Sequence, residues 1–332
     1  MKKILITGGS GFIGSNLGRV LATNGHKITF IDSLKYGYEE NLDFPELESS
    51  TKIFQDLRNL DLKAILCNQE IVFHLAGISS LPECEANPYE AFDVNTSLVA
   101  KILDAARHSS IKRIFLASTS AVYENNIGAN FETDYVEPDL IYPLTKKSAE
   151  EICHSYFKNY GVPVVICRFF NVYGPNQDFK REYPPFTSYL VRELNAGRTP
   201  TIYNSSQVRR DYLYVDDLIG MLVALINTPD QIDGEIFNLT SNLAYTPLEI
   251  LESLARILSK EISYNEGDAR NFWTKEKRLA EGNFHLSFAR IEKEVFKASS
   301  GSNDKIGSYF DLNKLTDIHV GLRKILEFQR SY

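Results

Sequence analysis

The sequence has no excess of positive charge. Its 332 residues include 36 lysines and arginines against 43 aspartates and glutamates, which gives a formal net charge of −7 at pH 7. Broad nucleic-acid binding requires a concentrated basic face that attracts phosphates. We therefore expect no nucleic-acid partner, although one or two arginines are enough to hold a small anionic ligand.

Cysteine pairs and long apolar runs are also missing. None of the four cysteines forms a C-x-x-C pair or has histidines beside it at metal-ligand spacing, so we expect reduced thiols and no metal site. No uninterrupted apolar stretch approaches the roughly 20 residues that span a bilayer. At the N-terminus, the apolar run Ile4–Ile6 is too short for a secretory signal and leads directly into glycines. The expectation is a cytoplasmic protein with no membrane partner.

Short apolar runs alternate with helical patterns through the first half of the chain. Such alternation, with continuously apolar strands, is typical of a parallel sheet covered by helices on both faces. The predicted fold class is α/β, a doubly wound parallel sheet of the Rossmann type. Strands are expected at Ile4–Thr7, Lys27–Ile31, Ile71–Leu75, Ile114–Ala117 and Val164–Arg168, and helices at Phe12–Asn24, Val94–His108 and Tyr142–Asn159.

The second half is less regular and predicts a smaller, mixed C-terminal lobe. Helices are expected at Phe186–Ala196 and Tyr212–Asn227, and a strand at Glu235–Leu239. The polar stretch Ser299–Asp304 is interpreted as a surface loop because it is rich in Gly, Ser and Asn. We expect the sheet lobe to comprise residues 1–175 and about 212–243, and the smaller lobe to comprise about 176–211 and 244–332.

A glycine-rich turn, Thr7–Gly14, follows the first predicted strand and opens the first helix. Gly8 permits a tight turn, Gly11 lets the backbone approach a diphosphate, and Gly14 lets helix and strand pack closely. The helix N-terminus then faces the phosphate charge. Asp32 ends the second strand eighteen residues beyond Gly14. A carboxylate there binds both ribose hydroxyls and repels a 2′-phosphate, so the pattern predicts NAD rather than NADP.

Tyr142, Lys146 and Thr119 form a candidate proton-transfer site. Tyr and Lys four residues apart share one face of a helix. The ammonium beside the phenol, together with a positive nicotinamide ring, favours the phenolate and lowers its pKa from about 10 toward the working pH. Thr119 ends the fifth strand and can hydrogen-bond the same substrate oxygen. This set predicts oxidation of a carbinol or reduction of a carbonyl.

Two further positions leave alternatives open. Asp56 follows a further strand, the third along the chain, which is expected between Lys27–Ile31 and Ile71–Leu75. There its carboxylate either accepts from an adenine amine or is a solvated loop acid. His74 ends the fourth strand and is more often a structural histidine than a catalyst at such a position. The small residues after it allow a cofactor to lie across the sheet edge.

Together these motifs resemble the extended short-chain dehydrogenase/reductases, and in particular their UDP-sugar 4-epimerase branch, over nearly the whole chain. The matching segments are TGGSGFIG, FIDSLKYG, HLAG, FDVNTS, STSAVY, YPLTK, RFFNVYGP and RRDYLYVDD. The resemblance implies that Thr119, Tyr142 and Lys146 are the catalytic triad, with Lys146 also holding the nicotinamide ribose. It places NAD in the sheet lobe and a nucleoside diphosphate sugar in the smaller lobe.

The resemblance also implies two sets of binding residues. The NAD-binding set is Gly8, Gly11, Phe12, Ile13, Gly14, Asp32, Lys35, Asp56, Leu57, Leu75, Ala76, Gly77, Asn95, Ser118, Tyr142, Lys146 and Phe169. The substrate-binding set is Ser79, Ser120, Asn171, Tyr203 and Arg210, with Asn171 and Arg210 at the diphosphate. An arginine fork matches phosphate oxygens, but a salt bridge from Arg210 to Asp211 or Asp216 is the alternative.

Several positions depart from the family pattern. Ser120-Ala121 replaces the Asp-Glu pair of the dehydratases, and Ala121 replaces a glutamate of the decarboxylating relatives, so neither of those reactions is expected. Glu124 replaces a usual glycine. A turn glycine is changed to Asn204-Ser205, and the second diphosphate arginine is absent from its place before Gly267. Arg270 or Arg278 is a possible substitute.

The predicted function is NAD-dependent epimerisation of a nucleoside diphosphate sugar, a UDP-hexose, by transient oxidation and re-reduction of C4. A nucleotide-sugar reductase or dehydrogenase of the same family is the alternative, and a non-catalytic NAD-binding regulator is a third. The resemblance further implies a homodimer in which the helices at Val94–His108 and Tyr142–Asn159 form a four-helix bundle. Apolar Leu98, Ile102 and Ile152 fit that bundle but also fit packing against the sheet.

Overall fold

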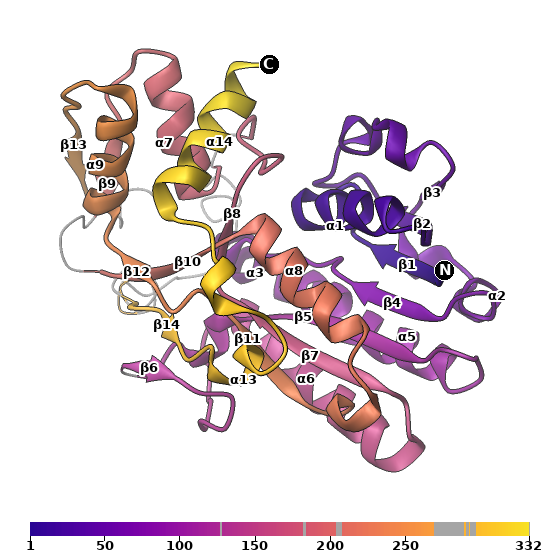
Figure 1. Cartoon of the computed structure of the whole chain (residues 1–332). Coiled ribbons are helices and arrows are strands. Elements are labelled where there is room, and N and C mark those ends of the chain that lie inside the picture. Colours follow the sequence, from indigo (N-terminus) through magenta and orange to yellow (C-terminus); the bar gives the residue numbers. More distant parts are fainter. Residues whose placement is uncertain are drawn as a thin grey trace.

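A parallel sheet of seven strands forms the centre of the molecule (Figure 1). The computed structural model describes residues 1–126, 128–181, 184–203, 208–268, 289, 292 and 297–331. Within these ranges the strand order is β11-β7-β5-β4-β1-β2-β3, and every neighbouring pair is parallel. The strands are β1 (Lys3–Thr7), β2 (Lys27–Asp32), β3 (Thr51–Phe54), β4 (Ile71–His74), β5 (Arg113–Thr119), β7 (Val164–Phe169) and β11 (Ile236–Leu239). The predicted doubly wound fold is confirmed.

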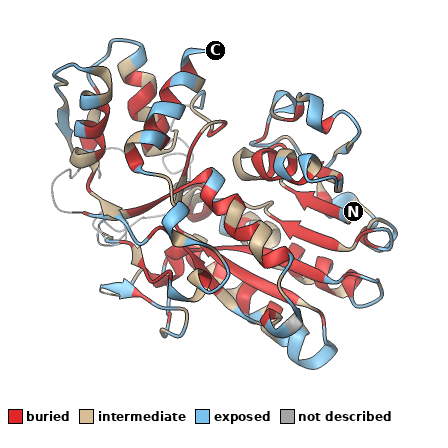
Figure 2. Ribbon diagram, viewed as in Figure 1, coloured by how far each residue is buried: buried red, intermediate tan, exposed pale blue. Residues whose placement is uncertain are grey.

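Alternate residues of each strand point to opposite faces of the sheet, and both faces are covered. On one face, Ile4 and Ile6 pack with the apolar sides of α1 (Phe12–Thr23) and α8 (Val215–Ile226). On the other face, Leu5 packs with the second helical layer. That layer consists of α2 (Leu62–Leu66), α5 (Leu98–Ala106) and α6 (Ile141–Tyr160). The strands at the centre of the sheet are therefore buried throughout (Figure 2).

A smaller group of elements stands beside the sheet. Three helices pack against one another, α7 (Phe186–Asn195), α9 (Pro247–Leu258) and α14 (Ile318–Arg330), as Figure 1 shows. Short sheets accompany these helices. They are built from β8 (Asn171–Tyr173), β10 (Arg210–Tyr214) and β12 (Ala244–Tyr245), from β9 (Thr201–Tyr203) and β13 (Asn265–Gly267), and from β6 (Ala129–Asn130) and β14 (Ser300–Gly301). The remaining short helices include α3 (Leu81–Ala86), α4 (Pro88–Phe92) and α13 (Asp304–Gly307).

Two predicted elements differ from the structure. The helix expected from Tyr212 begins at Val215, because residues 212–214 extend β10 and pair with β8. The stretch Ser299–Asp304 was expected to be a surface loop, and this is wrong. Its residues Ser300–Gly301 form β14, and Ser299, with 5% of its surface exposed, is buried.

Hydrogen bonds explain how such a polar segment is buried. The carbonyl of Ser299 accepts from the backbone N–H of Asp211 at 2.7 Å, and the Asn303 amide donates to the carbonyl of Ser241 at 3.0 Å. Gly301 lies so close to the Phe170 ring that a β-carbon would approach it to 2.3 Å. Small, polar residues are therefore used here because the segment threads between other chain segments.

None of the described helices combines the length and apolar character needed to cross a bilayer.

Candidate active site

A cavity of about 170 Å³ lies where β5 ends and where β8 and β10 begin. Its described walls bring together residues from six separate parts of the chain. They are Leu81, Thr119, Ser120, Ala121, Tyr142, Asn171, Arg210, Lys297 and Ser299. The candidate catalytic pair Thr119 and Tyr142 therefore faces the same space as the candidate diphosphate ligands Asn171 and Arg210.

Local structure fixes the positions of Thr119 and Tyr142. Thr119 is the last residue of β5, and its hydroxyl accepts from the N–H of Ala121 at 3.1 Å, which starts a tight 3₁₀ turn. Tyr142 is the second residue of α6, whose N-terminus follows directly from a loop held by Glu124. One carboxylate oxygen of Glu124 accepts from the N–H of Leu140 at 2.9 Å and from that of Asp139. The unusual Glu124 thus ties the turn after Thr119 to the start of the helix that carries Tyr142.

Lys146 lies one helical turn beyond Tyr142, is buried, and is not among the described lining residues of the first cavity. Its ammonium donates to the carbonyl oxygen of Ala117 at 2.7 Å. Burial lowers the pKa of Lys146 from 10.5 to about 8, although the nearby Glu150 and two thiols act in the opposite direction. A lysine with such a pKa is sensitive to proton loss near neutral pH.

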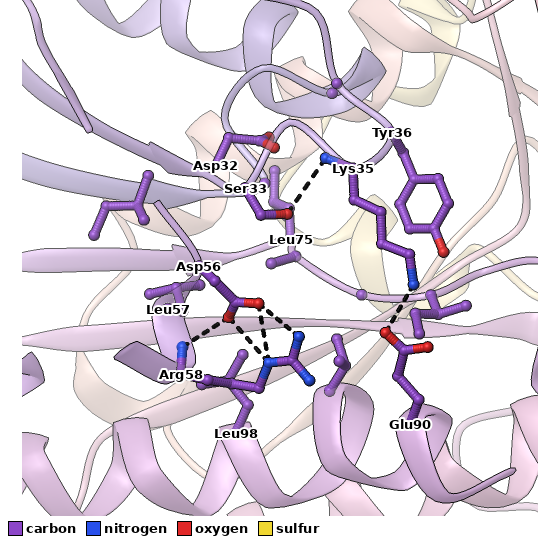
Figure 3. Close-up of a pocket in the computed structure, with 18 residues that line it drawn as sticks. Asp32, Ser33, Lys35, Tyr36, Asp56, Leu57, Arg58, Leu75, Glu90 and Leu98 are labelled. Atoms are coloured by element: carbon purple, nitrogen blue, oxygen red, sulfur yellow. Dashed lines mark hydrogen bonds and ion pairs between the residues drawn. The ribbon is translucent and has the colours of Figure 1, made fainter. Parts of the chain in front are cut away.

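A second cavity of about 150 Å³ lies at the carboxyl ends of β1, β2 and β4. The chain runs from β1 through β2 to β3 on one side and then crosses to β4 on the other side of β1, so this edge is the switch point at which such folds bind ligands. Figure 3 shows its walls, in which Asp32 ends β2, Ser33 and Lys35 follow it, and Asp56 and Arg58 follow β3. Further described residues lining it include Gly8, Gly11, Leu57, Leu75, Ala76, Gly77, Ile78, Glu90, Val94 and Leu98.

The glycine turn closes one end of this second cavity. Gly8 has a φ of +69°, and a β-carbon there would lie 2.7 Å from the backbone nitrogen of Ala76. A β-carbon on Gly14 would lie 2.3 Å from the carbonyl oxygen of Gly8, so this glycine packs α1 against the turn itself. No side chain caps the N-terminus of α1, and its first turn carries no acidic residue. Its N–H groups suit a bound diphosphate.

Asp32 is held rigidly at the end of β2. One of its oxygens accepts from the N–H of Ser10 at 2.9 Å, and the other accepts from the N–H of Leu34 at 2.8 Å. Burial raises the pKa of this carboxyl, while these two hydrogen bonds lower it. The backbone therefore fixes the orientation of this carboxylate.

Asp56 is not simply a solvated loop acid. Its carboxylate pairs with the guanidinium of Arg58 at 2.6 Å. The hydrogen bonds that Arg58 donates in this pair lower the pKa of Asp56. Arg58 also pairs with Asp93 at 2.9 Å, and the ammonium of Lys35 pairs with Glu90 at 2.8 Å (Figure 3). No sequence motif marks Arg58, because its contacts depend on carboxylates from two separate segments.

His74 is structural. Its Nδ1 lies 2.7 Å from the hydroxyl oxygen of Thr7, and complete burial lowers its pKa to about 3. Asn95 is also fully buried. Its amide oxygen accepts from the N–H of Ile78 at 2.8 Å, and its amide nitrogen donates to the Thr145 hydroxyl at 3.1 Å. Asn95 therefore lies behind the HLAG segment rather than among the described walls of either cavity.

Six other predicted residues are not among the described lining residues of the second cavity. Phe12 and Ile13 open α1, and Phe169 ends β7. Ser79 is exposed, and Tyr203 ends β9 with 37% of its surface exposed. Ser118 is buried and donates to Glu150 at 2.5 Å. None of these six is among the described lining residues of the first cavity.

Asn171 and Arg210 stand at the first residues of the paired strands β8 and β10. The Asn171 amide donates to the carbonyl of Asp211 at 2.8 Å and to the Ser299 hydroxyl at 3.4 Å. The carboxylate of Asp211 accepts from the Ser241 hydroxyl at 2.9 Å, and that of Asp216 pairs with Lys324 at 3.5 Å.

Two polar residues of the first cavity, Lys297 and Ser299, were missed from the sequence. Ser299 belongs to the segment that was expected at the surface, Lys297 precedes that segment by two residues, and no motif marks either of them. The altered turn Asn204-Ser205 and the candidate substitutes Arg270 and Arg278 lie outside the described residues.

Comparison with known proteins agrees with this architecture. Residues 4–240 match the model of the NAD dependent epimerase/dehydratase family. A Bacillus subtilis (strain 168) protein named as an uncharacterized UDP-glucose epimerase, YtcB, is 31% identical over 298 residues, which cover 83% of this chain and 91% of that protein.

Two solved structures cover nearly the whole chain. A UDP-N-acetylglucosamine 4-epimerase from Methanobrevibacter ruminantium M1, in complex with UDP-N-acetylmuramic acid, is 27% identical with a TM-score of 0.85, covering 99% of this chain and 98% of that one. A mutant UDP-glucuronic acid 4-epimerase from Bacillus cereus, in complex with UDP-4-deoxy-4-fluoro-glucuronic acid and NAD, is 26% identical with a TM-score of 0.84, covering 99% and 100%.

Proposed function

Because the chain belongs to the NAD dependent epimerase/dehydratase family, we propose that it is an NAD-dependent enzyme that inverts C4 of a nucleoside diphosphate sugar, a UDP-hexose. The observation that carries the proposal is the shared cavity, in which Thr119 and Tyr142 face Asn171 and Arg210. A proton-transfer site and a diphosphate site are thereby joined in one space.

The second cavity fits the adenosine and diphosphate portions of NAD. Asp32 accepts from the ribose hydroxyls, and the N-terminus of α1 faces the diphosphate across Gly8 and Gly11. We assign the remaining cofactor contacts to the NAD-binding set named above, including Asp56 at the adenine. When bound, NAD supplies a hydride acceptor that later returns the hydride.

The chain's own residues handle the proton. Tyr142 removes the proton from the 4-hydroxyl and returns it when the carbonyl is reduced. Thr119 hydrogen-bonds the same oxygen, and the Lys146 ammonium stabilises the phenolate through its positive charge. Asn171 and the fork of Arg210 hold the diphosphate, with Ser79, Ser120 and Tyr203 as further substrate contacts.

A reductase or dehydrogenase of the same family is the second candidate, since the same three residues serve a one-way reaction. Incubation with UDP-glucose and UDP-glucuronate, with product analysis and absorbance of NADH, separates the candidates. We expect a C4 epimer without net NADH. Accumulated NADH would indicate a dehydrogenase, whereas NAD binding without any product would indicate a regulator.

Nucleotide recognition has its own test. Calorimetry with UDP, GDP, CDP, ADP and dTDP is expected to show one preferred nucleotide, which we expect to be UDP. Arg210→Ala should bind that nucleotide with an affinity lower by about tenfold or more. If no nucleotide binds, or if Arg210→Ala binds the best one equally well, the nucleotide-sugar assignment fails.

We further assign residues 1–175 and about 212–243 to the NAD lobe, and about 176–211 and 244–332 to the sugar-nucleotide lobe. A cytoplasmic homodimer that pairs α5 and α6 remains a proposal. Leu98 and Ile102 are buried against the sheet of their own subunit, so the bundle would use the outer surface, where Phe157 and Tyr160 are exposed. Light scattering of the purified protein tests the dimer.

A further inference from the structure

Lys297 brings a second cation to the cavity that contains the candidate triad. Its ammonium donates to the carbonyl oxygen of Ser120 at 3.4 Å, next to Thr119 in the chain. Arg210 is the other cation of the described walls, and no described lining residue is acidic. The cavity therefore suits a ligand with more than one anionic group.

The backbone around Lys297 fixes the direction of its side chain. Ser299, two residues later, donates its N–H to the carbonyl of Arg209 at 3.0 Å and accepts from the N–H of Asp211 at 2.7 Å. Residues two apart in extended chain point to the same side. The Ser299 hydroxyl points to Asn171, so Lys297 points into the same cavity, as its contact with Ser120 also shows.

The arrangement of atoms in a hexopyranose then assigns the two cations, Lys297 and Arg210, to different parts of the ligand. The diphosphate is attached at C1, across the ring from C4, whereas C6 is carried by C5, the neighbour of C4. Thr119 and Tyr142 mark the position of C4. Lys297, bound to the carbonyl that follows Thr119, is at the C4 end of the sugar, and Arg210 remains for the diphosphate at the C1 end.

We propose that Lys297 determines specificity by pairing with a carboxylate at C6, so that the preferred substrate is a nucleoside diphosphate hexuronate. The inference rests on the proposed function, because it takes the position of C4 from Thr119 and Tyr142. An ammonium–carboxylate pair is a strong, charge-assisted hydrogen bond in a partly enclosed site. A neutral hydroxymethyl group at C6 gains only an ordinary hydrogen bond there.

Two other roles for Lys297 give different experimental results. Lys297 stabilises the carboxylate of Glu124, whose pKa is raised by burial and lowered by Lys297. A purely structural role of this kind would affect both sugars equally. A role as the second diphosphate cation would weaken the binding of UDP itself, which carries no sugar.

The experiment compares wild type with Lys297→Met, Lys297→Gln and Lys297→Arg, and uses Lys314→Met as a control because Lys314 is an exposed lysine far from the lining residues. Calorimetry measures the affinity for UDP, UDP-glucose and UDP-glucuronate, and kinetics gives kcat and KM for both sugars. We expect wild type to prefer the uronate. Lys297→Met should lower the affinity for UDP-glucuronate by about tenfold or more, while the affinities for UDP and UDP-glucose should change by less than about threefold. Lys297→Arg should restore part of the preference.

Several results would overturn the proposal. They are a wild type that favours UDP-glucose, an equal loss for both sugars, a loss of UDP affinity, or the failure of both neutral variants to fold. Failure of the proposed function is recognised separately, because wild type would then bind UDP without converting either sugar, or would not bind UDP at all.

Discussion

Glu150 and Arg168 form a buried, two-pronged ion pair directly behind the candidate triad. The Arg168 Nε and Nη2 atoms donate to the two carboxylate oxygens of Glu150 at 2.9 and 2.7 Å, and both side chains are almost completely buried. Glu150 lies one turn after Lys146 on α6, and Arg168 lies on β7. The pair therefore locks the helix that carries Tyr142 and Lys146 onto the sheet.

Breaking this pair should destabilise the protein strongly. Glu150→Ala or Arg168→Met leaves one buried charge without its partner, so we expect a loss of about 3–5 kcal/mol in the free energy of unfolding, measured in urea. The exposed pair Lys147–Glu151 on the same helix is the matched control, and Glu151→Ala should cost less than about 1 kcal/mol. Equal losses at the two sites would contradict the locking role.

Tyr142→Phe should abolish turnover without releasing the cofactor. The hydroxyl carries the proton, whereas the ring only packs, so kcat should fall by roughly 10²–10⁴-fold. NAD affinity should change little, and Tyr135→Phe at an exposed position should be neutral. Retention of more than about a tenth of wild-type activity would remove Tyr142 from the mechanism.

Activity should decline as pH rises through the pKa of Lys146. Burial lowers this pKa to about 8, so the ammonium is present below pH 8 and lost above it. The neutral amine no longer stabilises the Tyr142 phenolate, and kcat/KM should therefore fall on the alkaline side. Lys146→Met should have low activity and should lack this fall of kcat/KM at alkaline pH. A wild-type kcat/KM that stays constant up to pH 10 would refute the role of the Lys146 ammonium.

Wild type should prefer NAD to NADP, and Asp32→Ala should narrow the preference by about tenfold or more. The reason is that two backbone N–H groups hold the Asp32 carboxylate in place, where, in the proposed binding mode, it faces the ribose and repels a 2′-phosphate. Titration of both cofactors by fluorescence gives the ratio. Equal affinities in the unmodified protein would contradict the role of Asp32.

The sequence predicts well what depends on local pattern. The apolar runs predict the parallel strands, and Gly14 is required by a contact between the glycine turn and the helix that follows it. The spacing of Tyr142 and Lys146 places both on α6, as expected. Each of these features is decided by neighbours along the chain, which is why one sequence suffices.

Features decided by distant partners were missed. Ser299 has the composition of a surface loop, yet hydrogen bonds to β10 bury it. Tyr212 continues an apolar run that fits a helix, but pairing with Asn171 makes it part of a strand. Lys297 acquires its place only because the segment after it is fixed in this way. Tertiary pairing overrides the local preference at all three positions.

The burial of Ser299–Gly301 against β10 and β6 has a consequence for protein synthesis. The described residues that line the second cavity end at Leu98, and the last strand of the central sheet ends at Leu239. The first cavity, by contrast, also includes Lys297 and Ser299. Since domains form from the N-terminus during translation, the nascent chain completes its cofactor cavity well before its catalytic cavity. With NAD in the second cavity as proposed, a ribosome-bound chain would be able to bind the cofactor before Lys297 and Ser299 complete the first cavity, and it would become active only when the last part of the polypeptide has folded.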